Sequence, residues 1–154
     1  MTAIYRSSKT FIGYPCAHRR WRHEGHCAFV HGYSRSFRIW FESNERTENG
    51  FVVDFGALAA VKAWLTEHFD HTLLIDSDDP LMEQFQELAR RGACRLVTYA
   101  DVGMEGTAKY IYDWLDPWIR SATGGRAWVA SVEAIENEKN SAIYIADRPG
   151  ASVL

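Results

Sequence analysis

The chain has 154 residues, of which 47% are hydrophobic and 24% charged, a composition typical of one folded domain. A formal net charge of −3 excludes a broad basic surface for nucleic acid or for an anionic membrane, with the basic run at residues 19–23 as the one local exception. No apolar run has the length of a transmembrane helix. We therefore expect a single domain, residues 1–154, without nucleic-acid or membrane partners.

The three cysteines of the chain indicate its redox environment. Cys16, Cys27 and Cys94 are odd in number and form no CxxC pair. Such usage is typical of a reducing compartment rather than of a disulfide framework. We expect three free thiols and a cytoplasmic location.

The first half of the chain predicts two strands followed by two helices. Residues 10–18 are rich in aromatic and β-branched side chains, and residues 34–41 alternate apolar with polar side chains, as a half-buried strand does. Apolar residues at helical spacing predict a helix over residues 56–69, with Asp54 as a candidate N-cap. A second helix is predicted over residues 79–92, opened by a proline and stopped by a glycine.

The second half predicts a short strand, a long helix and two closing strands. The strand covers residues 95–99, and the helix runs from about residue 104 to 119, with a break expected near Pro117. Residues 127–135 and 141–146 then read as a β-hairpin. Helices segregated onto one face of an antiparallel sheet define the α+β class.

Side chains that suit chemistry gather around the second strand. Cys27 precedes His31 by four residues, and in an extended chain His31 and Tyr33 project to the same face. Cys16 and His18 share a face of the first strand for the same reason. Taken alone, the two residues favour a structural interpretation, with Cys27 as a small buried hydrophobe and His31 as a hydrogen-bonded core histidine.

Two further polar features lie elsewhere in the chain. Asp70 and His71 follow the end of the first predicted helix, and Glu136 precedes Tyr144 by eight residues. In isolation the first pair reads as a turn, and Glu136 reads as a solvated charge of the hairpin.

The order and separation of these features resemble the 6-pyruvoyltetrahydropterin synthase family, which includes the 6-carboxytetrahydropterin synthases. The resemblance covers nearly the whole chain, and it implies a tunnelling fold in which subunits join their sheets edge to edge. The expected assembly is a homo-oligomeric barrel, a trimer or a hexamer, with active sites between subunits. The matching motifs are Ala17-His18, Cys27-x-x-x-His31-Gly32, Gly50 to Phe55, Asp70-His71, and Glu136 with Tyr144.

The resemblance also implies a zinc ion that polarises the side chain of 7,8-dihydroneopterin triphosphate. His18 and His31 match two of the three family histidines, but Tyr33 stands where the third is expected. A neutral phenol is a poor zinc donor, so we expect Cys16, a good thiolate ligand on the same strand face as His18, to complete the site. His26, or Tyr33 itself, remains an alternative, as does loss of the metal.

The family's remaining functional residues map onto four more positions and one partial match. Cys27 matches the thiol that acts as base, while Asp70 and His71 match the dyad that relays protons. Glu136 matches the carboxylate that pins the two-donor edge of the pterin ring. Of the Pro-Thr-x-Glu motif that opens the third helix only Glu105 survives, and we keep it as a substrate-binding candidate.

These expectations lead to one reading of function and two alternatives. The first is a lyase that converts 7,8-dihydroneopterin triphosphate to 6-carboxy-5,6,7,8-tetrahydropterin, releasing acetaldehyde and triphosphate, in queuosine biosynthesis. The alternatives are the related 6-pyruvoyltetrahydropterin synthase reaction and a non-catalytic pterin- or purine-binding protein with an altered metal site.

Overall fold

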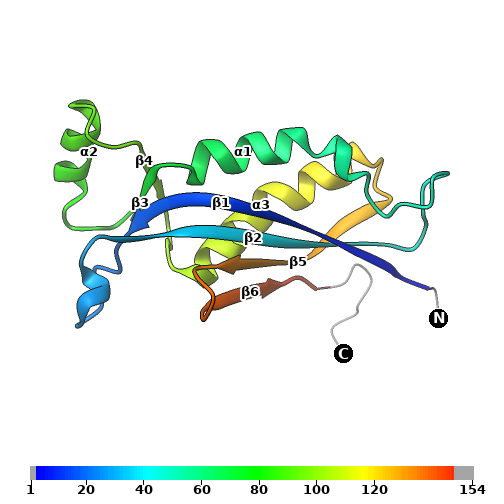
Figure 1. Ribbon diagram of the computed structural model, residues 1–154, viewed down its shortest axis with the longest axis horizontal. Helices are drawn as coiled ribbons and strands as arrows, with labels where there is room; N and C mark the ends of the chain where they lie inside the picture. The colour runs from blue at the N-terminus through cyan, green and yellow to red at the C-terminus, as the bar shows by residue number, and fades with distance from the viewer. Residues whose placement is uncertain (1–2, 148–154) are drawn as a thin grey trace.

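The computed structural model describes residues 3–147, in which a curled six-stranded sheet carries two long helices on one face (Figure 1). The strands are β1 (Tyr5–His18), β2 (His31–Ser43), β3 (Thr72–Asp76), β4 (Leu96–Tyr99), β5 (Ala127–Ile135) and β6 (Ser141–Ile145). The helices are α1 (Ala59–Phe69), α2 (Met82–Arg90) and α3 (Met104–Ala122), with 3-10 turns η1 (His26–Ala28) and η2 (Phe55–Ala57). The α+β prediction is confirmed. No helix in this part of the chain is long and apolar enough to cross a membrane.

The sheet is mixed, whereas the sequence pattern predicted an antiparallel one. Its strand order is β4-β3-β1-β2-β5-β6, in which β3 runs parallel to both β1 and β4 and the remaining pairs are antiparallel. The sequence pattern did not predict β3. All five of its residues are buried, so exposed polar side chains do not alternate with buried apolar ones. A short apolar run of this kind does not distinguish a strand from other buried structure.

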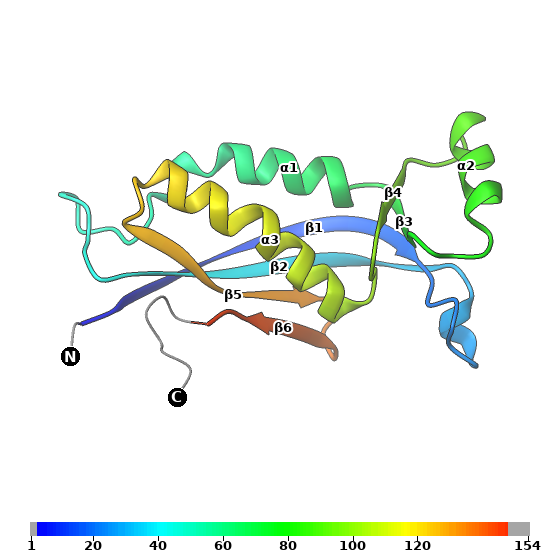
Figure 2. The ribbon, with the colours of Figure 1, turned by 180° about the vertical axis from the view of Figure 1, so that it is seen from behind.

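Helices α1 and α3 lie side by side over the same face of the sheet (Figure 2). Their apolar stripes pack on the inward-facing side chains of β2 and β5, and these surfaces form one core. Alternation along β2 and the 3.6-residue period of the helices bring the apolar side chains together. The core includes Phe37, Ile39 and Phe41 of β2, Val61, Leu65 and Phe69 of α1, and Ala108, Ile111, Leu115 and Ile119 of α3.

Helix α3 continues through Pro117 to Ala122, so the break expected at the proline is wrong. A proline inside a helix removes the amide that would bond the carbonyl four residues earlier, here that of Asp113. Both Pro117 and Asp113 are exposed, so water can reach that carbonyl. The opposite side of the helix buries Leu115 and Ile119, and this packing holds the last turns in place.

The two longest strands, β1 and β2, form a ladder that carries the chemistry-bearing residues at one end. The ladder runs from the Tyr5–Ser43 pair to the His18–His31 pair. Its register shifts once, at a bulge that contains Gly13 with φ 85°. The pairing therefore places His18 at the end of β1 directly opposite His31 at the start of β2.

Candidate functional site

The centre of the site is a pair of imidazoles that face each other across the β1–β2 ladder. The ring centroids of His18 and His31 are 4.6 Å apart. Between the rungs that carry His31 and Tyr33, the backbone of Gly32 approaches β1 so closely that an added Cβ would lie 2.7 Å from the Cys16 carbonyl oxygen. Only glycine allows this approach, so Gly32 sets the spacing of the two strands at the site.

Each imidazole of the pair has a nitrogen without a hydrogen-bond partner among the described residues. His18 is 3% exposed, and its Nδ1 makes no hydrogen bond to residues 3–147. Burial, followed by the positive charges of Arg35, His31 and Arg20, lowers the pKa of His18 to about 3, so this ring is neutral at physiological pH. The Nδ1 of His31 donates to the Phe29 carbonyl oxygen at 2.7 Å, and its Nε2 makes no hydrogen bond to residues 3–147.

Glu136 brings a carboxylate to the same place. It follows the last residue of β5, and one ligand atom from each of His18, His31 and Glu136 lies within 4.8 Å of the others. One carboxylate oxygen, Oε2, accepts a hydrogen bond from the Asn140 amide at 3.4 Å across the β5–β6 hairpin. Two imidazoles and a carboxylate are therefore grouped at one end of the sheet.

Cys16, Tyr33 and His26 were the candidates for a third metal ligand. Cys16 pairs with Tyr33 two rungs inward from the histidines, is buried, and is not part of the group of converging donors within residues 3–147. Burial raises the pKa of the Cys16 thiol, although the charge of Arg35 opposes this. The Tyr33 ring stands edge-on to His31 with centroids 5.8 Å apart. The exposed His26 lies in η1.

Cys27 lies in η1, within the loop that joins β1 to β2. All three cysteines are free thiols, as predicted. The amide of Arg20 donates to the Cys27 carbonyl at 2.8 Å, which fixes the backbone beside the thiol. The arginines of this loop form ion pairs with aspartates at the end of β3, in the turn that follows it, and after β4. These ion pairs are Arg19 with Asp79, Arg20 with Asp76 and Asp101, and Arg22 with Asp78.

Asp70 and His71 form a hydrogen-bonded pair at the turn from α1 to β3. The Nδ1 of His71 lies 2.6 Å from Oδ1 of Asp70, and the His71 side chain is 78% exposed. His71 has a positive φ of 56°, unusual for a residue other than glycine, and its amide donates to the Pro15 carbonyl at 2.7 Å. The turn thus presents the outer edge of an oriented imidazole to solvent.

The structure brings some of the predicted residues together and leaves others apart. His18, His31 and Glu136 converge, whereas the Cys27 thiol makes no hydrogen bond to the Asp70–His71 pair or to any other residue between 3 and 147. Glu105 is exposed in the first turn of α3, where the positive end of the helix dipole favours a carboxylate.

Sequence reasoning missed Arg35, which lies next to the site. It is fully buried, and its guanidinium makes one long hydrogen bond, 3.3 Å from Nη1 to Thr107 Oγ1. Its Nε and Nη2 have no hydrogen-bond partner in the described part of the chain. The strand alternation does indicate that Arg35 is buried, because it faces the same side of β2 as the core residues Phe37 and Ile39.

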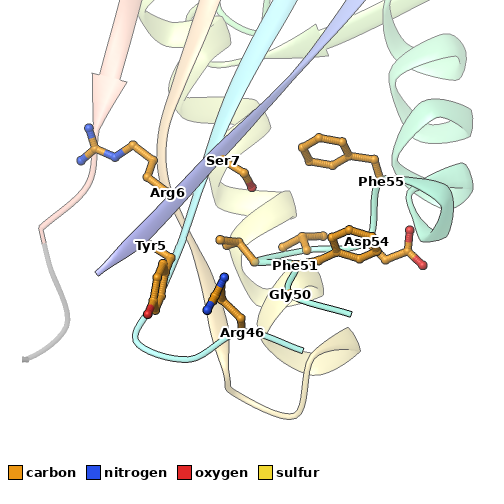
Figure 3. Close-up of a pocket in the computed structure, with 10 residues that line it drawn as sticks. Tyr5, Arg6, Ser7, Arg46, Gly50, Phe51, Asp54 and Phe55 are labelled. Atoms are coloured by element: carbon orange, nitrogen blue, oxygen red, sulfur yellow. The ribbon is translucent and has the colours of Figure 1, made fainter. Parts of the chain in front are cut away.

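A separate pocket of about 480 Å³ lies at the opposite end of the sheet (Figure 3). It is lined by the start of β1 and by residues 46–55, and along β1 it is roughly 35 Å from His18. Two of its charged groups have partners: Arg46 stacks over the Tyr5 ring at 4.7 Å, and Asp54 accepts from the Gly56 amide at 2.9 Å. That bond caps η2, as predicted for Asp54, and α1 begins only at Ala59. The buried hydroxyl of Ser7 has no hydrogen-bond partner among the described residues.

The fold and the site together define an α+β domain that presents a histidine-based donor site at the end of its two longest strands. The chain belongs to the 6-pyruvoyl tetrahydropterin synthase family, whose sequence profile matches residues 8–147. The resemblance seen in the sequence motifs is confirmed.

Curated relatives of the chain have one activity in their names. The 6-carboxy-5,6,7,8-tetrahydropterin synthase of Rickettsia felis is 36% identical over 74 residues, which are 47% of this chain and 54% of the relative. The enzyme of the same name from Aquifex aeolicus is 28% identical over 99 residues, 62% of this chain and 60% of the relative. The chain therefore spans about half the length of the curated relatives it matches.

Solved structures extend the likeness of the fold over nearly the whole chain. An uncharacterized protein of Wolinella succinogenes superposes with a TM-score of 0.79 at 24% identity, covering 94% of this chain and 99% of that one. The 6-pyruvoyl tetrahydropterin synthase of Caenorhabditis elegans superposes with a TM-score of 0.65 at 16% identity, covering 95% and 98%. At these identities the likeness shows the fold alone.

Proposed function

We propose that the protein is a lyase that converts 7,8-dihydroneopterin triphosphate to 6-carboxy-5,6,7,8-tetrahydropterin, releasing acetaldehyde and triphosphate. The observation that carries the proposal is the facing pair of His18 and His31 in a chain of the synthase family. The names of the curated relatives favour the 6-carboxy product over the 6-pyruvoyl one. In the cell this reaction would supply the carboxylated pterin for queuosine synthesis.

The histidine pair fits a divalent metal such as zinc. His18 has a buried Nδ1 without a partner in the described chain, and the hydrogen bond from His31 Nδ1 to a backbone carbonyl is the usual way of orienting a metal-ligating imidazole. Neutral imidazole nitrogens are preferred zinc ligands. We propose that His18 and His31 hold zinc, which when bound would act as a Lewis acid on the side-chain oxygens of the substrate.

The chain's own residues supply the proton transfers of the proposed reaction. Cys27, in the loop beside the histidine pair, is proposed as the base that removes a proton from the substrate side chain. The Asp70 carboxylate holds His71 with Nδ1–H toward itself, so that Nε2 of the exposed ring is free to accept or return a proton. Substrate binding by Glu105 also stays a prediction.

We propose that these groups meet between subunits of a homo-oligomer. Cys27 and the Asp70–His71 pair make no contact within the described part of one chain, and His71 faces outward. Within residues 3–147, the two outer strands of the sheet, β4 and β6, each have one edge without a neighbouring strand, and Ile143 and Ile145 on β6 are exposed. Pairing of such edges between copies, in a trimer or hexamer, would satisfy their backbone groups and bring the two halves of the site together.

Product analysis with 7,8-dihydroneopterin triphosphate tests the proposal. We expect acetaldehyde and triphosphate from the wild type, and a loss of about 10²- to 10⁴-fold in kcat for Cys27→Ala, the range for removal of a catalytic base. Cys94→Ala is the matched control, because Cys94 belongs to a separate small core near α2. Triphosphate release without acetaldehyde would favour the 6-pyruvoyl reaction, and pterin binding without turnover would identify a binding protein.

A further inference from the structure

We infer that Glu136 is the third metal ligand of this chain and that it completes, with His18 and His31, a two-histidine, one-carboxylate site for a divalent ion of the zinc class. The inference rests on the proposed metal chemistry of the site. It gives Glu136 a different task from the pterin contact that the family resemblance implies, and it explains how the site can lack a histidine at position 33.

The sheet delivers the three side chains to one place. The His18–His31 rung ends the β1–β2 ladder, and the Ser36–Ile135 rung ends the β2–β5 ladder immediately before Glu136. The three ligand atoms already lie within 4.8 Å of one another. Donors that share one zinc ion at about 2.0–2.2 Å are roughly 3–4 Å apart, so side-chain rotations are enough to close the site.

Each side chain keeps a donor atom free for the ion. The buried Nδ1 of His18 has no hydrogen-bond partner among residues 3–147. The Nδ1–H of His31 donates to Phe29, so its Nε2 carries the lone pair that a metal needs. Asn140 holds Oε2 of Glu136, and Oε1 makes no hydrogen bond to residues 3–147. Asn140 would therefore orient the metal-bound carboxylate of Glu136 through a hydrogen bond from outside the metal's own ligands.

The competing donors are placed less well. Cys16 lies two rungs inward from the His18–His31 pair and does not join the converging group among the described residues. Tyr33 offers a phenol, which is not among the usual zinc donors, and His26 is exposed on the connecting loop. A carboxylate ligand also brings a negative charge, which the two imidazoles do not. This charge would offset the buried positive charge of Arg35, which acts on His18.

Zinc and cobalt binding by the full chain tests the inference. Glu136→Gln should lower zinc affinity, measured by chelator competition, by more than about 100-fold, beyond the roughly 10- to 100-fold effect of outer-shell partners. Glu138→Gln, an exposed neighbour in the same hairpin, and Cys16→Ala should leave affinity unchanged. The Co(II) wild-type protein should lack the intense thiolate-to-metal charge-transfer band, a measurement that needs no variant to fold.

The outcomes separate this inference from the proposed function. A thiolate-to-cobalt band, or loss of zinc in Cys16→Ala or Tyr33→Phe with retention in Glu136→Gln, would overturn the role of Glu136 while leaving the lyase proposal intact. If Glu136→Gln instead keeps zinc and loses affinity for a pterin analogue, the carboxylate is the pterin anchor. If the protein binds zinc through Glu136 but releases no acetaldehyde, Glu136 is confirmed as a metal ligand and the proposed lyase activity is refuted.

Discussion

The Arg35 guanidinium lies fully buried against Thr107, with Nη1 3.3 Å from the threonine Oγ1 and no carboxylate paired to it among residues 3–147. A permanently charged group in this position costs free energy, because its lost hydration is not replaced. Thr107 does not depend on it, since its hydroxyl also contacts the Tyr99 hydroxyl at 2.8 Å.

We therefore expect Arg35→Met to raise the free energy of unfolding of the metal-free protein by about 1–3 kcal/mol. Chemical denaturation measures the change, and Arg38→Met, at an exposed position of the same strand, is the control that should change stability by less than about 0.5 kcal/mol. A loss of stability in Arg35→Met would show instead that the buried guanidinium stabilises the fold.

The low pKa of His18 predicts how stability depends on pH when no metal is bound. Below its ordinary pKa of about 6.5 the unfolded chain protonates this imidazole, whereas the folded chain does so only near pH 3. The unfolded state thus binds more protons in this window, and stability falls as the pH drops, by about 3 kcal/mol between pH 7 and pH 4.

Denaturant unfolding in the presence of a chelator measures this slope. His18→Gln should flatten it, and His26→Gln, at an exposed position, should keep it. An unchanged slope in His18→Gln would assign the pH dependence to other groups.

Gly32→Ala should separate the two strands at the site. The new methyl group would lie 2.7 Å from the Cys16 carbonyl oxygen, and a backbone atom cannot turn away as a side chain can. We expect a loss of about 1–3 kcal/mol in the free energy of unfolding, with weaker zinc binding because His18 and His31 move apart. Gly25→Ala is the comparison, because its methyl group meets only the rotatable ring of His23. Full stability and zinc affinity in Gly32→Ala would show that the ladder tolerates a wider spacing.

Much of the fold could be predicted from the sequence because most of its elements have a period. The alternation around Phe37 to Phe41 predicts β2, and the helical spacing from Ala108 to Leu115 predicts α3. The strand β3 could not be recognised, because a fully buried strand of five residues has no alternation. The sequence predicts a helix break near Pro117, but α3 continues to Ala122. The proline is tolerated because it lies on the exposed side of the helix, which the sequence pattern alone does not weigh.

The site could be predicted only in part, because its geometry depends on strand pairing. Motif order pointed to His18 and His31, but their face-to-face position follows from the β1–β2 register. Glu136 could not be placed beside them without knowing where the β2–β5 ladder ends. Arg35 was overlooked although its phase along β2 put it on the buried face.

In the proposed active site, Cys27 of one subunit and the Asp70–His71 pair of another act on the same substrate at the metal site. Subunit mixing tests it most directly, because Cys27→Ala and His71→Ala subunits are each expected to form inactive assemblies. When the two are dissociated and reassembled together, a site with both intact residues forms at some interfaces. Mixing Cys27→Ala with the Cys27→Ala/His71→Ala double variant provides the control.

With equal mixing, about a quarter of the sites receive an intact Cys27 and an intact His71, so acetaldehyde release should return to about a quarter of the wild-type rate. The double-variant control should stay inactive. If the mixed assemblies, shown by co-purification on a tag to contain both variants, remained as inactive as their parents, Cys27 and His71 would not be parts of one site shared between subunits.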